Sequence, residues 1–203
     1  MNDLVATYVA KHSDRFPAGI GTVEVKHGDA SLRELERIAK DLKLRGVVWH
    51  HADSGVPIDH RFMRPILREV EKLQLIPFVH VHKPGYESWW RLEVLAEEFP
   101  GITFVALAAM TSVDDKDQGL QIASTRKNIL FDTGPVFWRG ESAIESFVKR
   151  IGVERLLFGS DFSGMPPSYQ YATTNLQMIR NSRLSTQEKA MVLSGNAKRL
   201  LGL

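Results

Sequence analysis

Residues 46–82 read GVVWHHADSGVPIDHRFMRPILREVEKLQLIPFVHVH and contain two apolar runs separated by an amphipathic segment. The apolar runs Gly46–His50 and Ile76–His82 predict strands, and the periodicity of Phe62–Leu73 predicts a helix. Strands that are apolar along their whole length are buried on both faces, which favours a parallel sheet covered by helices. This stretch therefore predicts one strand–helix–strand unit of an α/β fold.

The same alternation continues through the rest of the chain. Further strands are predicted at Gly21–Val25, Ile102–Leu107, Ile129–Thr133 and Leu156–Gly159. Further helices are predicted at Ser31–Leu42, Trp89–Phe99, Asp117–Arg126, Glu141–Ile151 and Tyr171–Ile179. Capping boxes are predicted at Ser31 with Glu34 and at Ser185 with Glu188, the second opening a last helical stretch. Six strand–helix units in a single domain, residues 1–203, indicate an α/β fold with a parallel sheet, either a (β/α) barrel or a doubly wound sheet.

Composition limits the classes of partner. The 203 residues include 26 Lys and Arg and 24 Asp and Glu, interspersed along the chain, so neither nucleic acid nor an anionic membrane is an expected partner. No apolar segment approaches the ~20 residues of a membrane span, and the N-terminus does not resemble a signal peptide, so we expect a cytoplasmic protein. Without cysteine, any metal must be bound by His, Asp or Glu. The expected partner is a small-molecule substrate or another protein chain.

Polar residues follow four of the predicted strands, at the end where active sites of parallel sheets are built. They are His50–His51, His80–His82, Asp132–Thr133 and Ser160–Asp161. On a strand, His80 and His82 would project to the same face and could bind one metal ion together. Alternatively, one of them bonds only to neighbouring backbone, or His82 lies beyond the strand end.

Asp161 follows a buried strand and a Gly–Ser turn, a position that favours a catalytic or metal-binding carboxylate; the alternative is a helix N-cap. His50 is a second catalytic candidate, and Lys83, Tyr86 and Trp49 are candidates for substrate binding. The GSDFSG segment does not fit a serine nucleophile elbow, and no nucleotide-binding motif is present.

The segments NILFDTGPV, RLLFGSDFSGMP and LSGNAKRLLGL, within an order of strands that covers nearly the whole chain, resemble the amidohydrolase-related family, in its aminocarboxymuconate-semialdehyde decarboxylase-like branch. The resemblance implies a metal-dependent (β/α)8 barrel, usually with zinc, so the six units of this chain are expected to form an incomplete TIM-barrel-like fold. Its ligands come from an HxH pair on the first strand, histidines on the fifth and sixth strands, and an aspartate on the eighth. By this resemblance the fifth-strand position falls on His80, which is favoured, or with a small register shift on His82, and Asp161 takes the eighth-strand position.

The sequence departs from this pattern at two points. Nothing before Met1 supplies the first two strands with their HxH pair, and Ala108 stands at the sixth-strand histidine position. We therefore expect a rebuilt site of three ligands, His80, His82 and Asp161, or of four with His50, binding a divalent metal such as zinc. Open sheet edges would favour a homo-oligomer. The expected function is metal-dependent hydrolysis or non-oxidative decarboxylation of a small carboxylated or cyclic substrate. The alternatives are a catalytically degenerate binding or assembly protein and an inactive fragment of such an enzyme.

Overall fold

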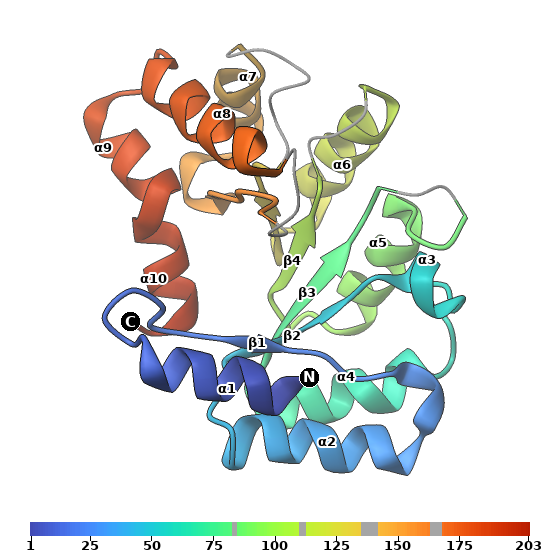
Figure 1. Cartoon of the computed structure of the whole chain (residues 1–203). Coiled ribbons are helices and arrows are strands. Elements are labelled where there is room, and N and C mark those ends of the chain that lie inside the picture. Colours follow the sequence, from blue (N-terminus) through green and yellow to red (C-terminus); the bar gives the residue numbers. More distant parts are fainter. Residues whose placement is uncertain (83–84, 110–112, 135–141, 163–167) are drawn as a thin grey trace. The chain divides into compact units, whose positions relative to one another are not determined.

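A computed structural model of the chain describes residues 1–82, 85–109, 113–134, 142–162 and 168–203 (Figure 1). Six strands alternate with helices, and their order in the sheet is their order in the chain, as predicted for a TIM-barrel-like (β/α) fold. The strands are β1 (Ile20–Gly21), β2 (Gly46–Trp49), β3 (Ile76–His80), β4 (Phe104–Leu107), β5 (Ile129–Asp132) and β6 (Leu156–Leu157).

The helices cover most of the predicted ranges and add two that were not predicted, α1 and α3. They are α1 (Asn2–Lys11), α2 (Asp29–Lys40), α3 (His51–Ser54), α4 (Met63–Lys72), α5 (Trp89–Glu98), α6 (Val113–Thr125), α7 (Ser142–Ile151), α8 (Ser168–Asn181), α9 (Thr186–Ala190) and α10 (Asn196–Leu201). Between α9 and α10 the chain forms a π-helix, Met191–Gly195. Among the described residues, no helix combines the length and apolar composition needed to cross a membrane.

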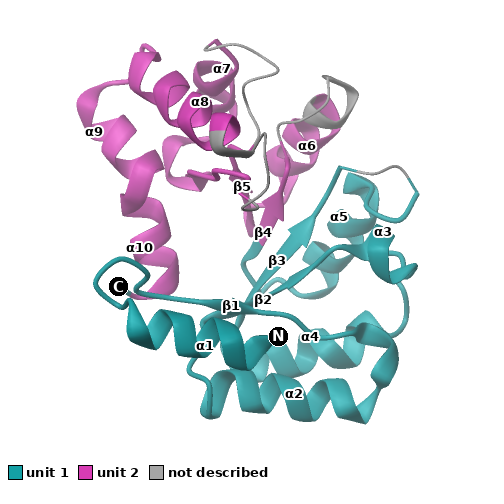
Figure 2. Cartoon of the chain, viewed as in Figure 1, with its two compact units in different colours: residues 1–104, 203 teal, residues 105–202 magenta. Residues whose placement is uncertain are grey.

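The chain divides into two compact units (Figure 2). Unit 1 comprises Met1–Phe104 with Leu203, and unit 2 comprises Val105–Gly202. Single-domain organisation over residues 1–203 stays a prediction.

In unit 1, β2 pairs in parallel with both β1 and β3. The register sets Trp49 opposite Val79, so the two strands end side by side and His50 and His80 follow at the same edge. Helices α2 and α4 contact each other, and each contributes fully buried side chains to the core. These include Leu35, Ile38, Ile66, Leu67 and Val70. Such burial, worth about 1.5–3 kcal/mol per large aliphatic side chain, holds the strand ends in place.

Strand β1, Ile20–Gly21, is shorter than the predicted Gly21–Val25, and Val25 belongs to a 3₁₀ turn, Val25–His27. The chain after β1 is covered by α1. The side chain of Asn2 is buried, accepts from the backbone N–H of Thr22 at 2.9 Å and donates to its carbonyl at 2.8 Å. This amide therefore pairs with the backbone of Thr22 much as a neighbouring strand would.

One predicted capping box is confirmed and the other is wrong. Ser185 accepts from the backbone N–H of Glu188, whose carboxylate accepts in return from the N–H of Ser185. Helix α2 instead begins at Asp29, after Gly28, whose φ of 52° is in the left-handed region that glycine adopts at little cost. Ser31 therefore lies inside the helix, and its hydroxyl donates to the carbonyl of Glu24.

In unit 2, β5 pairs in parallel with β6. The buried guanidinium of Arg155 joins the segments before these strands, because it donates to the carbonyls of Ile129, Ala123 and Arg126 at 2.7–3.1 Å. Asn196 of α10 donates to the carbonyls of Val153 and Leu156 at 2.7 and 2.8 Å. These bonds satisfy carbonyl groups that would otherwise be buried without donors.

Candidate active site

The best-defined polar cluster of unit 1 lies at the carboxyl ends of β2 and β3. Strand β3 shows alternate burial, with Pro77 and Val79 buried and Ile76, Phe78 and His80 partly exposed. His80 is its last residue, so the rigid strand places the imidazole at the sheet edge. The strand is two residues shorter than the predicted Ile76–His82.

Glu87 holds the ring of His80. Its carboxylate is buried, with Oε1 accepting from the backbone N–H of Ala52 at 2.9 Å. Its other oxygen, Oε2, lies 2.7 Å from Nδ1 of His80. A carboxylate oxygen can only accept, so Nδ1 of His80 carries the proton and donates. Nε2 of His80 is then left with its lone pair, which is the form of imidazole that binds a metal.

Burial favours the neutral state of His80. It lowers the pKa of this imidazole below the usual value, and the carboxylate of Glu87 offsets only part of the effect. A neutral imidazole keeps Nε2 available near neutral pH, whereas an imidazolium could not ligate an ion.

The ring of His50 stacks on that of His80, with centroids 4.5 Å apart and an interplanar angle of 28°. One ligand atom from each of His50, His80 and Glu87 lies within 4.8 Å of the other two. Two donors on opposite sides of an ion with bonds of about 2.1 Å are about 4.2 Å apart. Both oxygens of Glu87 are already bonded, so the imidazoles of His50 and His80 are the groups of this cluster that can bind an ion, and imidazole suits a divalent transition metal.

His82 lies two residues beyond the end of β3, as one of the sequence alternatives foresaw. Its ring is edge-on to that of His80, with centroids 6.1 Å apart. His82 does not belong to the three-residue donor cluster found among the described residues. Its role as a ligand stays a prediction.

The two histidines after β2 differ in surroundings. His50 is exposed and lines a cavity, whereas His51 is buried and its Nδ1 lies 2.9 Å from the carbonyl of Val56. Burial lowers the pKa of His51, which keeps it neutral. His51 therefore stabilises the turn through its contact with Val56, and His50 is the one of the two histidines that can contact a ligand.

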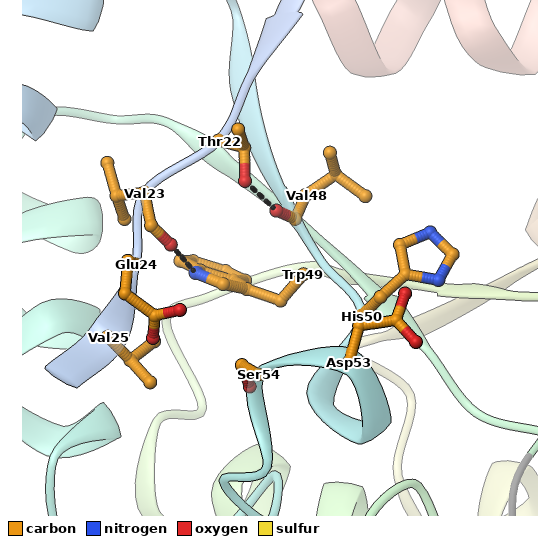
Figure 3. A pocket seen from close by; sticks show the side chains of 9 residues that line it. All are labelled: Thr22, Val23, Glu24, Val25, Val48, Trp49, His50, Asp53 and Ser54. Carbon is orange, nitrogen blue, oxygen red and sulfur yellow. Dashed lines mark hydrogen bonds between the residues drawn. The ribbon is translucent and has the colours of Figure 1, made fainter. Parts of the chain in front are cut away.

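The cavity beside His50 has a volume of about 510 Å³ (Figure 3). Its lining combines apolar side chains with two carboxylates, two hydroxyls and an imidazole: Thr22, Val23, Glu24, Val25, Val48, Trp49, His50, Asp53 and Ser54. The buried indole of Trp49 forms part of this lining, and its N–H donates to the carbonyl of Val23 at 3.1 Å. The indole is thus fixed, and it presents apolar surface of the kind that binds a flat substrate.

The other predicted substrate-binding residues are less defined. Lys83 lies outside the described residues. Tyr86 is 43% exposed, and its carbonyl accepts from the backbone N–H of Ile58 at 3.0 Å. A role for either side chain in binding substrate stays a prediction.

In unit 2, Asp161 follows β6 and is exposed. Its φ of 52° places it in the left-handed region, which aspartate enters more readily than most residues other than glycine. Asp132, at the end of β5, has a buried carboxyl group. Burial raises its pKa to about 8, although N–H groups of Ala108, Gly134 and Ala109 donate to the carboxyl.

Sequence reasoning missed Glu87. It lies seven residues after His80, on the far side of a loop, and its sequence neighbours Tyr86 and Ser88 give no pattern that links it to the histidine. The available signal was a single carboxylate shortly before the Trp89–Trp90 helix start. That signal is too weak without the fold, because the contact with Ala52 spans 35 positions.

Comparison with known proteins adds the evolutionary context. The profile of the family described as amidohydrolase matches residues 1–203. The 2-amino-3-carboxymuconate-6-semialdehyde decarboxylase of Dictyostelium discoideum is 23% identical over 241 positions, which cover 100% of this chain and 66% of the relative. The chain thus spans slightly under two thirds of the length of that relative.

Two solved structures have the same fold. The 5-carboxyvanillate decarboxylase of Sphingomonas paucimobilis superposes with a TM-score of 0.78 at 22% identity, covering 100% of this chain and 71% of that one. The 5-carboxyvanillate decarboxylase of Novosphingobium aromaticivorans, complexed with manganese and 4-hydroxy-3-methoxy-5-nitrobenzoic acid, gives a TM-score of 0.74 at 20% identity, with coverage of 100% and 68%. With a family profile that matches over its whole length, this chain belongs to the amidohydrolase family.

Proposed function

We propose that this protein is a metal-dependent decarboxylase that acts on a small carboxylated aromatic or cyclic compound, with its divalent cation bound at His50 and His80. The observation that carries the proposal is the state of His80, a neutral imidazole at a strand end with Nδ1 bonded to a buried carboxylate. This bond leaves the lone pair of Nε2 available to a metal ion.

In this proposal His80 binds the cation through Nε2, His50 is a second ligand, and Glu87 orients His80. Imidazole suits a divalent transition metal, and the ligand atoms of His50 and His80 lie within 4.8 Å of each other. Such a cation, when bound, would polarise substrate oxygens and stabilise negative charge that develops on the substrate. The predicted further ligands His82 and Asp161 remain part of the proposal.

The remaining residues bind the substrate and move a proton. The cavity of about 510 Å³ lies within the range of small-molecule sites, and Trp49 gives it a rigid apolar surface. In decarboxylation the bond between the ring carbon and the carboxylate breaks, its electron pair stays on the carbon, and carbon dioxide leaves. A proton must then reach that carbon, and we assign this transfer to Asp161.

The names of the relatives support decarboxylation over hydrolysis, since the curated relative and both solved structures are decarboxylases. The substrates in their names are carboxylated, and two are substituted benzoates. A panel for this protein should therefore begin with hydroxylated benzoates and extend to carboxylated muconate semialdehydes. Hydrolysable lactones and amides form the comparison set for the alternative amidohydrolase reaction.

The test is elemental analysis together with turnover. Tag-free protein loaded with manganese or zinc is expected to retain close to one ion per chain and to release carbon dioxide from at least one member of the panel. His80→Ala should lose both properties, and the matched control His27→Ala, a change at an exposed histidine, should keep both. Asp161→Asn should lose turnover. Metal-free wild type after loading, or equal retention by His80→Ala, would refute the proposal.

We also propose that the native metal is zinc rather than manganese, that the chain forms a homo-oligomer and that the protein is cytoplasmic. Elemental analysis of protein purified without added metal would decide the first, and sedimentation at several concentrations would decide the second. Neither result bears on the proposal that His80 binds the cation through Nε2.

A further inference from the structure

The buried carboxyl group of Asp132 lies where loops after three strands of unit 2 meet. The backbone N–H groups of Ala108 and Ala109, after β4, and of Gly134, after β5, act on this carboxyl as donors that lower its pKa against the effect of burial, whereas its Oδ1 has no hydrogen-bond partner among the described residues. Its Oδ2 touches Gly159, after β6, so closely that a methyl group at position 159 would overlap it. A Cβ at position 134 would lie 3.2 Å from the same oxygen, so both glycines make room for the carboxyl.

Gly159 is also held at both of its backbone polar groups. Its N–H donates to Oγ1 of the buried Thr133 at 3.1 Å, and its carbonyl accepts from Nδ2 of the buried Asn175 at 3.2 Å. The backbone N–H of Thr133 donates in turn to the carbonyl of Leu157 at 2.9 Å. Three side chains, those of Asp132, Thr133 and Asn175, therefore surround one glycine; we name this group the Gly159 clamp.

The clamp lies next to two strained residues. Asp161, two positions after Gly159, has a φ of 52°, and Ala108, which donates to Asp132, has a φ of 55°. Neither is glycine, so each conformation costs energy that neighbouring contacts must offset. The Gly159 clamp provides such contacts at Gly159, two residues before Asp161, and between Asp132 and Ala108.

We infer that Asp132 is a positioning residue, which through the Gly159 clamp fixes the backbone conformation and hence the direction of Asp161. The inference rests on the proposed function for the role of Asp161, but the clamp itself is independent of that role. A carboxyl at position 132 has two structural tasks, to accept from the loop after β4 and to fill the space beside Gly159. An alanine can do neither, whereas an asparagine keeps an acceptor oxygen and nearly the same volume.

Hydrogen exchange of the full chain, followed by mass spectrometry, tests the clamp without any metal or substrate. In Asp132→Ala, peptides covering residues 105–109 and 156–162 are expected to exchange at least about tenfold faster, because backbone N–H groups lose their acceptor or its support. Asp132→Asn should stay close to wild type. The control Ser182→Ala removes another buried hydrogen bond of unit 2, to the carbonyl of Ile179, and should leave these peptides unchanged.

If Asp132→Ala does not fold, Thr133→Val keeps the inference testable. This nearly isosteric change removes only the acceptor of the Gly159 N–H, and faster exchange confined to 156–162 is expected. Unchanged exchange of 156–162 in the folded variants, or the same acceleration in Ser182→Ala, would overturn the inference.

Turnover then tests the positioning role. On a substrate from the panel, Asp132→Ala should lower kcat with KM close to wild type, and Asp132→Asn should restore most of kcat. Equal loss in both variants would overturn the positioning role, because volume and an acceptor oxygen would not suffice. If wild type turns over no substrate, the proposed function fails, and the exchange result still decides whether the clamp exists.

Discussion

Replacing Glu87 with glutamine changes one oxygen into an NH₂ group and leaves the size of the buried side chain unchanged. The N–H of Ala52 requires an acceptor, so the amide oxygen must face it, and the NH₂ group faces Nδ1 of His80. Nδ1 must then accept, which moves the imidazole proton to Nε2. The lone pair proposed to bind the cation is thereby removed.

The expected losses of metal affinity and of stability depend on which groups each substitution leaves without a hydrogen-bond partner. Changes to the partner of a metal-bound histidine typically reduce metal affinity by about 10–100-fold, and we expect Glu87→Gln to fall in this range. Its stability should drop by only about 1–2 kcal/mol, since both hydrogen bonds persist in neutral form. Glu87→Ala would leave the N–H of Ala52 and Nδ1 of His80 without this acceptor, and should cost about 3–5 kcal/mol.

The assay is titration of metal-free protein with Mn²⁺, following free Mn²⁺ by electron paramagnetic resonance, beside urea unfolding of the same samples. Asp14→Asn, which removes one negative charge at an exposed position, is the matched control and should bind as wild type does. Wild-type affinity in a folded Glu87→Gln variant would refute the reasoning, because the tautomer of His80 would then not matter.

Three further changes test other parts of the account. The pKa of Asp132 is about 8 in the folded chain and about 3.9 in the unfolded chain. As the pH rises, the unfolded state therefore loses this proton first. The free energy of unfolding should fall by roughly 1.4 kcal/mol per pH unit between about pH 4 and 8. Urea unfolding across that range should show a decline of this size in wild type beyond that of Asp132→Asn; parallel pH profiles would contradict it. Arg155→Met leaves three backbone carbonyls without their donor and should cost about 3–5 kcal/mol in urea unfolding, whereas a loss below about 1 kcal/mol would show that the bonds are dispensable. His82→Ala should weaken Mn²⁺ binding while thermal unfolding stays unchanged, and unaltered binding would remove His82 from the ligand set.

The positions of the strands could be predicted from sequence because continuous apolar runs leave few alternatives. The polar residues at the strand ends followed directly, which is why His50, His80 and Asp132 were placed correctly. Strand and helix limits were less exact: β1 ends at Gly21, and α2 begins before Ser31 because the turn at Gly28 overrides the capping-box pattern.

The partners of these residues could not be predicted, since they depend on contacts distant in sequence. Glu87 reaches Ala52 across 35 positions, and the Gly159 clamp joins residues 26 and 16 positions apart. Helix α1 was missed as well, because its hydrophobic pattern is weak and its docking depends on Asn2 bonding to Thr22. Local patterns carry no information about such pairings.

The most direct test of the central claim is the electron spin echo envelope modulation spectrum of the Mn²⁺-loaded chain, which detects nitrogen nuclei bound to the ion. The account predicts nitrogen modulation from coordinated imidazole in wild type and its loss or marked reduction in His80→Ala, with the spectrum of His27→Ala unchanged. A spectrum without nitrogen coupling, or one that His80→Ala leaves intact, would contradict the proposal that His80 binds the metal.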